Sequence, residues 1–403
     1  MKKICLTLIG IYLMMLHAFG QYYDKDTTTY ESKPLKIDEI NLVSSYYSQN
    51  GDHSPITGGI GTEKVTDLSN GLDVKWVGWD AMNHKHTLTA GLGFDHHTSA
   101  SSAYVSKTGA SKTGGSRYYP SLDWLEENTK KGTSFGLGLY VSKEYNYSSF
   151  GIDGQFSKKT KNNGEFTGKL SGYFDRVKMI YPSEFVPIVT TVTSASGDGH
   201  GGKPKIPSKP RTTGTLSLSF SQVINQRMQG IIMVDGVFQG GYLGLPFHRV
   251  YFTNGGDLIE NLPANRLKLP IGIRLNYFLG DKIIIRSYYR YYIDSWGLQA
   301  HTANLEVPIK FTPFISVAPF YRYYTQTAVR YFAPYEMHSI TDQFYTSNYS
   351  LSGFNSQFFG VNFRIAPPKG IFTGLSAIEL RYGHYSQTTD LVSDVISLDL
   401  KFK

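Results

Sequence analysis

Residues 267–279, LKLPIGIRLNYFL, alternate with a period of two along their whole length. Every odd-numbered position carries Leu, Ile or Tyr, whereas the even-numbered positions include Lys268, Gly272, Arg274 and Asn276. Successive side chains of a strand point to opposite faces of a sheet. The stretch therefore predicts a β-strand with one apolar face and one polar face.

The same alternation recurs along the chain, for example at Phe359, Val361 and Phe363. Strands are predicted near residues 38–49, 64–79, 85–97, 117–125, 133–143, 147–157, 165–177, 213–224, 229–240, 267–279, 282–293, 299–310, 314–325, 354–366, 373–385 and 391–402. A soluble β-sandwich also alternates, but its strands usually span about 5–6 residues. Most of the predicted strands are longer, as tilted membrane strands are. Tyrosine pairs such as Tyr291-Tyr292 at strand ends suit the aromatic girdles of a membrane barrel.

The connections between these strands alternate between short and long. The long ones are 98–116, 178–212, 241–266 and 326–353, and all four fall on the same side if the strands are antiparallel. Short turns at one end and long loops at the other are typical of bacterial outer-membrane barrels. We therefore predict an all-β fold, a transmembrane antiparallel β-barrel of about 16 strands with periplasmic turns and extracellular loops. Without the segments 64–79 and 117–125 the count would fall to about 14.

Composition supports this class. The chain has 403 residues, of which 18% are charged and 14% aromatic, with a formal charge of +8. After the first 20 residues no run approaches the roughly 18 apolar residues of a membrane-spanning helix, and the many aromatic residues argue against disorder. The mild positive charge does not call for a nucleic-acid partner.

The first 20 residues read as a secretory signal peptide. Lys2 and Lys3 precede an apolar stretch, and Ala18-Phe19-Gly20 offers small residues before a cut at Gln21. Cys5 is the one cysteine and lies within this segment, so the mature chain has neither disulfides nor thiolate metal sites. We expect a signal peptide at 1–20, a periplasmic segment at 21–37 and the barrel at 38–403.

The polar faces of the C-terminal strands would line the barrel interior. They carry two carboxylates, Glu306 and Glu379, and six arginines: Arg274, Arg286, Arg290, Arg322, Arg364 and Arg381. One interpretation is a basic lumen that favours anions, because charges lining a pore set its selectivity. The other is a wall of Arg–carboxylate pairs that holds the barrel shape. The sequence leaves both open.

Acidic and histidine residues gather at the predicted outer ends of the first three strands. They are Asp52, His53, Glu63, Asp95, His96 and His97. Such side chains at one rim could bind a divalent metal, although no established ligand spacing is present and exposed polar loop residues are common. No other cofactor is predicted. No nucleophile motif appears either, so an enzyme is not expected.

Seven stretches resemble a family of outer-membrane β-barrels of Bacteroidota and related Gram-negative bacteria, catalogued as a domain of unknown function. They are SYYSQNGDH at 45–53, TGGIGTE at 57–63, DHHTSAS at 95–101, QVINQR at 222–227, LPANR at 262–266, YRYYIDSWG at 289–297 and FYRYYTQ at 320–326. The family usually has an acidic residue where this chain has Asn50, which weakens a metal site around Asp52.

The resemblance implies a partner role in an envelope redox or flavinylation system, because genes of this family tend to lie near those of a small lipoprotein, a thioredoxin-like protein and a flavin transferase. It implies no catalytic residues. Two hypotheses follow. The protein is either a channel for small, perhaps anionic, solutes in the outer membrane, or a plugged or lipoprotein-bound barrel that acts as a scaffold in such a complex.

Overall fold

The computed structural model describes residues 32–98, 114–182, 185, 206–372 and 374–403. The signal peptide expected at 1–20 and most of the segment 21–37 lie outside the described residues, as do parts of the loops 98–116 and 178–212. No helix in the described part of the chain is long and apolar enough to cross a membrane.

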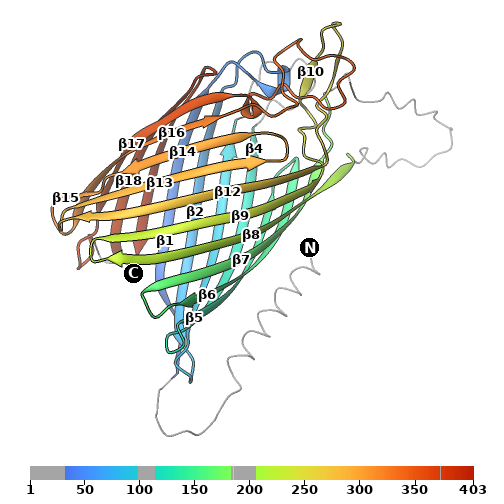
Figure 1. The fold of residues 1–403 in the computed structure, drawn as a ribbon. Coiled ribbons are helices and arrows are strands. Elements are labelled where there is room, and N and C mark those ends of the chain that lie inside the picture. Colours follow the sequence, from blue (N-terminus) through green and yellow to red (C-terminus); the bar gives the residue numbers. More distant parts are fainter. Residues whose placement is uncertain (1–31, 99–113, 183–184, 186–205, 373) are drawn as a thin grey trace.

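The strands form one closed antiparallel barrel (Figure 1). In chain order they are β1 (Lys33–Asn50), β2 (Val65–Trp79), β3 (Lys85–His97), β4 (Gly115–Asn128), β5 (Thr133–Lys143), β6 (Tyr147–Lys159), β7 (Gly164–Lys178), β8 (Ser208–Asn225), β9 (Met228–Gly241), β12 (Asn265–Leu279), β13 (Ile283–Asp294), β14 (Gln299–Glu306), β15 (Ile309–Lys310), β16 (Ile315–Gln326), β17 (Phe354–Ile365), β18 (Leu375–Gln387) and β19 (Leu391–Phe402). The pieces β14 and β15 both lie between β13 and β16 and act as one barrel strand interrupted at Pro308. The barrel thus has 16 strands, as predicted.

Closure follows from the pairing of the first strand. Ile40 of β1 pairs with Val74 of β2 on one side and with Phe402 of β19 on the other. Every other barrel strand also has a neighbour on each side, so no edge is left open. A membrane-spanning sheet needs this closure, because backbone groups have no partner in hydrocarbon.

Alternation predicted the strands well, and the largest differences are at two strand starts. β1 begins at Lys33 and β8 at Ser208, earlier than the predicted 38 and 213. Both starts contain a proline and two Lys or Arg residues within their first four positions, yet they pair with neighbours: Lys33 with Trp79 and Ser208 with Lys178. Pairing with a long neighbouring strand extends these ends, and a periodicity argument cannot detect it.

The apolar faces point outward. Leu170, Ile232 and Leu267 are 65%, 53% and 59% exposed on the barrel exterior. In a soluble protein such a surface would be sequestered, but around a closed antiparallel barrel it forms the lipid-facing band of an outer-membrane protein. The protein is therefore located in the outer membrane, with its short turns on the periplasmic side.

The outer end carries a folded cap made of three connecting segments, 51–64, 242–264 and 327–353, near the β10 label in Figure 1. The cap contains the 3-10 helices η1 (Pro55–Thr57) and η3 (Tyr349–Leu351) and the hairpin of β10 (Arg249–Tyr251) and β11 (Asp257–Ile259). Single bridges join the segments, between Phe252 and His338 and between Asn261 and Tyr345. The cap therefore has long-range structure of its own.

An apolar cluster and a buried polar centre hold the cap together. Trp296, Leu298, Ala300 and Val329 form the cluster, which joins the cap to the outer ends of β13 and β14. In the polar centre the carboxylate of Glu260 accepts hydrogen bonds from His248 Nδ1 at 3.0 Å, the Leu245 amide at 2.6 Å and the Thr346 hydroxyl. The side chains of His248 and Glu260 are 0% and 1% exposed, so these bonds have no replacement in water.

The cap predicts one test. Glu260→Ala leaves three buried donors without their acceptor, at a cost of about 1–3 kcal/mol for each group left unpaired. We expect faster hydrogen exchange and faster proteolysis in residues 242–264, with the barrel itself unchanged. Asp342→Ala removes a cap carboxylate that is 41% exposed and should have a much smaller effect. Equal protection in the two variants would contradict the role given to Glu260.

The outward-facing side of the strands predicts a second test. Ile273→Arg places a charge in the lipid near the middle of β12, which costs about 2–4 kcal/mol at the bilayer midplane. Asn304→Arg places the same charge on the lumen-facing side of β14, where residue 304 lies opposite Tyr288 and Arg322 on the neighbouring strands. Unfolding by urea in lipid vesicles should show a lower free energy of unfolding for Ile273→Arg and no such loss for Asn304→Arg. A larger loss for Asn304→Arg would reverse the assignment of the two faces.

Candidate functional site

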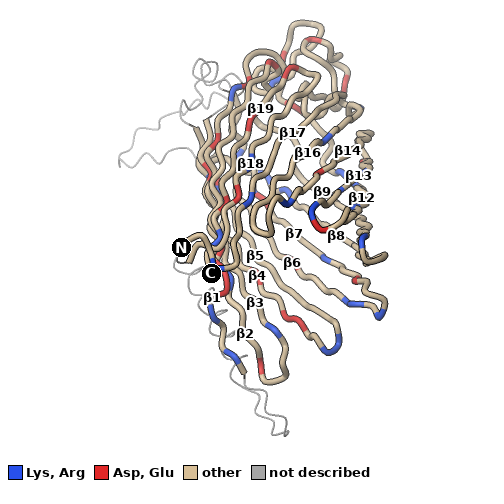
Figure 2. The backbone as a smooth tube through the Cα atoms, turned by 90° about the vertical axis from the view of Figure 1, so that its left-hand side faces the viewer, with Lys and Arg blue, Asp and Glu red and all other residues tan. Residues whose placement is uncertain are grey.

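The six predicted lumen arginines all have the inward-facing parity of their strands. The register of the strands gives their cross-strand neighbours: Arg274 lies opposite Tyr288, and Arg322 lies opposite Asn304 and Phe358. In Figure 2, Lys and Arg recur along the strands of this part of the barrel and at its periplasmic turns. The strands β12 to β18 therefore present a basic inner wall.

Two of the six arginines are neutralised. Arg286 Nη1 lies 2.7 Å from Glu306 Oε1, and Arg364 Nε lies 2.7 Å from Glu379 Oε1. These cross-strand pairs are bridges within the wall, so the interpretation as structural ion pairs applies to them. Glu306 and Glu379 are accordingly partners of arginines rather than free carboxylates.

The other four arginines, which we call the arginine arc, form no ion pair with a carboxylate in the described part of the chain. They are Arg274, Arg290, Arg322 and Arg381. Three lie over aromatic rings: Arg274 is 5.6 Å from Tyr288, Arg322 is 5.7 Å from Phe358 and Arg381 is 4.2 Å from Phe320.

The arginine arc concentrates positive charge. Arg322 is near enough to Arg290 and Arg381 for their charges to repel. Arg290 Nε has neither solvent contact nor a hydrogen-bond partner. Like charges held together without carboxylates produce a local positive potential that attracts anions.

Opposite this wall lies a set of carboxylates, which we call the acidic arc: Asp73 of β2, Asp123 of β4 and Asp153 of β6. Asp123 is near enough to Asp73 and Asp153 to feel their charges. Among the described residues only Asp153 forms an ion pair, with Lys169 at 2.9 Å, and the charge of Lys169 also acts on Asp123. The N-terminal wall is therefore acidic where the C-terminal wall is basic.

Glycines make room for these carboxylates. A Cβ atom at Gly91 would lie 2.7 Å from Asp73 Oδ1, and one at Gly138 would lie 2.6 Å from Asp153 Oδ2 and 2.7 Å from Asp123 Oδ1. Any larger residue at these inward positions would displace the acidic side chains. The sequence pattern showed glycines alternating with apolar residues on these strands, but it did not reveal that the carboxylates of neighbouring strands occupy the space they leave.

The two arcs lie at similar depth. Each of their seven residues is at most two positions from the middle of its strand. Because every strand runs from one end of the barrel to the other, its middle lies near the middle of the lumen. Two strands, β19 and β1, separate the arcs on one side, and three, β7, β8 and β9, separate them on the other. Asp399 of β19 and Asp235 of β9 lie in these gaps.

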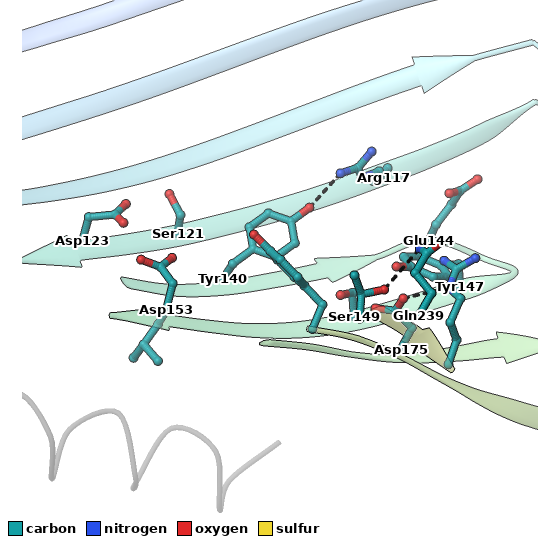
Figure 3. Close-up of a pocket in the computed structure, with 14 residues that line it drawn as sticks. Arg117, Ser121, Asp123, Tyr140, Glu144, Tyr147, Ser149, Asp153, Asp175 and Gln239 are labelled. Atoms are coloured by element: carbon teal, nitrogen blue, oxygen red, sulfur yellow. Dashed lines mark hydrogen bonds and ion pairs between the residues drawn. The ribbon is translucent and has the colours of Figure 1, made fainter. Parts of the chain in front are cut away.

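A cavity of about 730 Å³ opens in the acidic wall (Figure 3). Asp123, Ser121 and Asp153 lie at one end, and Arg117, Glu144 and Tyr147 lie toward the other. At the end near Arg117 the side chains pair with one another: Arg117 Nη2 donates to Tyr140 OH at 2.7 Å, and Arg211 Nε lies 2.9 Å from Asp175 Oδ2. Tyr140 and Tyr173, edge to face at 6.2 Å, also line the cavity.

The six residues considered for a metal do not converge. Asp52, His53 and Glu63 lie in or beside the first cap segment, where the His53 ring stacks on Tyr349 at 3.6 Å and its Nδ1 lies 2.8 Å from the Gly59 carbonyl. Burial raises the pKa of Glu63, and a hydrogen bond with Gln49 opposes this shift. Among the described residues, no group of three or more His, Asp or Glu side chains is arranged to hold a metal.

The other three residues are divided between the two faces of β3. Asp95 accepts a hydrogen bond from Tyr119 at 2.7 Å, and His97 lies between Asp67 and Glu144 on the inner face. His96 contacts Ser116 on the outer face. Neighbouring residues of a strand point to opposite sides, so His96 and His97 could not have served one site. The metal prediction therefore finds no support in the geometry.

Comparisons with solved structures find outer-membrane proteins of similar architecture. Pseudomonas aeruginosa OpdQ shares 9% identity and a TM-score of 0.40, covering 93% of this chain and 99% of its own. A BenF-like porin from Pseudomonas fluorescens shares 7% identity and a TM-score of 0.41, covering 91% and 98%. Acinetobacter baumannii OccAB3 shares 10% identity and a TM-score of 0.38, covering 92% and 99%. The likeness is one of fold class only.

A comparison with curated proteins finds no match. The model of one protein family matches residues 80–393, which include the strands β3 to β18 in full and the first three residues of β19. The resemblance in the sequence pointed to such a family, although its occurrence in Bacteroidota and related Gram-negative bacteria stays a prediction. The chain belongs to the family described as protein of unknown function (DUF3570).

Proposed function

We propose that the protein is an outer-membrane channel for small solutes, and that the anionic groups of these solutes contact the arginine arc on their way through. The observation that carries this proposal is the set of four arginines at mid-depth on one wall of the lumen that form no ion pair with a carboxylate in the described part of the chain. A wall built only for shape would pair them, as it pairs Arg286 and Arg364.

Size is consistent with transport. Barrels of about 16 strands are wide enough to hold an aqueous channel. Fixed guanidinium groups then act as a row of weak, exchangeable anion sites, which lets a solute enter and leave again. No residue is assigned a catalytic role, and the proposal is a passive pathway rather than an enzyme.

The scaffold hypothesis differs in one measurable respect. A barrel plugged by its cap or bound by a small envelope lipoprotein would be electrically silent. The folded cap at the outer mouth is compatible with either state. Steady conductance of the purified chain in a planar bilayer supports the channel, whereas silence together with recovery of a lipoprotein from native membranes supports the scaffold.

The arginine arc predicts a change in ion selectivity. Arg322→Gln should lower the permeability ratio of chloride over potassium by about 1.4- to fivefold, the range for an exposed charge contributing about 0.2–1 kcal/mol. The measurement is the reversal potential in a KCl gradient.

Arg364→Gln is the matched control. It removes the same charge from an arginine that already has a carboxylate partner and lies nearer the periplasmic end of its strand. We expect a smaller shift from this variant. An equal or larger shift would show that total charge, rather than the arginine arc, governs selectivity.

A further inference from the structure

We propose that the lumen selects dipolar solutes, small molecules that carry an anionic and a cationic group on one short chain, such as amino acids and betaines. The inference rests on the proposed channel function and narrows its solute class. Its basis is that the arginine arc and the acidic arc face each other across the barrel at the same depth.

The arcs impose opposite demands on a singly charged solute. A monoanion is attracted by Arg290, Arg322 and Arg381 but repelled by Asp73 and Asp123. A monocation is attracted by the acidic arc and repelled by the arginine arc. A dipolar solute can turn its anionic group toward one wall and its cationic group toward the other, so that both ends are stabilised. A lumen lined by arginines alone would instead favour the most highly charged anions.

The electric field between the two arcs is effective because their charges are largely unpaired. Among the described residues neither Asp73 nor Asp123 forms an ion pair with a basic residue, although the charge of Lys169 also acts on Asp123, and the arginine arc forms no ion pair with a carboxylate. The nearby pairs Arg286–Glu306 and Arg364–Glu379 show that this barrel does neutralise charges where strands bring opposite signs together. Separation of the two sets onto different walls prevents them from neutralising each other.

The cavity in the acidic wall independently indicates a place for a cationic group. Arg117 and Arg211 line the cavity toward one end. At the other end Asp123 and Asp153 line it near Tyr140 and Tyr173, and carboxylates with aromatic rings are the surroundings that ammonium groups favour. Asp175 lines it too: its side chain is only 4% exposed, yet its Oδ1 has no hydrogen-bond partner while Oδ2 is paired with Arg211. A buried carboxylate oxygen without a donor is a group that a ligand's N–H could satisfy.

Equilibrium exchange of labelled solutes across vesicles that contain the full mature chain tests the idea. Taurine and isethionate differ only by an ammonium in place of a hydroxyl, and glycine betaine and choline differ by a carboxylate in place of a hydroxymethyl group. We expect taurine to exchange about three- to fivefold faster than isethionate, and betaine to exceed choline by a similar factor, as for one solvent-exposed ion pair.

Variants separate the two arcs. Asp73→Asn combined with Asp123→Asn should abolish the advantage of taurine by accelerating isethionate. Arg322→Gln should reduce the advantage of betaine over choline. Asp67→Asn changes the same residue type on the same strand near its outer end and should leave both ratios unchanged. If it changes them as much as the double variant does, the acidic arc has no special role.

Failure of the inference and failure of the channel give different results. If the wild-type protein passes isethionate as fast as taurine or faster, dipolar selection is wrong while the channel stands. If no solute exchanges and the bilayer shows no conductance, the proposed function itself is wrong.

Discussion

The structure depends on one requirement, that every backbone amide and carbonyl inside the membrane must have a partner within the protein. The barrel meets it by joining β1 to β19, after which no strand has a free edge. Once the ring is closed, period-two alternation divides every side chain between lipid and lumen. The positions of the arginines and carboxylates are consequences of that division, since a polar residue on the outward parity would face hydrocarbon.

For this reason alternation alone recovered nearly all of the fold. The segments 85–97, 133–143 and 391–402 coincide with β3, β5 and β19. The inward parity of all six arginines also followed from sequence, because one polar face per strand determines it. The metal site at the rim stays a prediction without geometric support, since it grouped His96 with His97 although neighbouring residues of a strand point to opposite faces.

The acidic arc shows what a single strand cannot reveal. Asp73, Asp123 and Asp153 lie 50 and 30 positions apart in sequence, and only the register of five successive strands brings them together. The space they occupy is left by Gly91 and Gly138 on the strands between them. Pairing register depends on backbone hydrogen bonds between distant segments, and periodicity within each segment carries no information about it. The cap is harder still to predict, because the regular elements in its three segments are only three residues long and the segments are distant in sequence.

The seam between β1 and β19 also constrains how the molecule can be made. The hydroxyls of Ser45 and Ser397 lie 3.2 Å apart although 352 positions separate them in the chain. This contact cannot form until the final strand has joined the sheet, and a sheet without it has two unpaired edges. Such edges are prone to pair with other chains. An open sheet must therefore be protected from other chains until β1 and β19 pair in one late step. The risk of wrong pairing then depends on how long the open sheet persists, and not on how stable the closed barrel is.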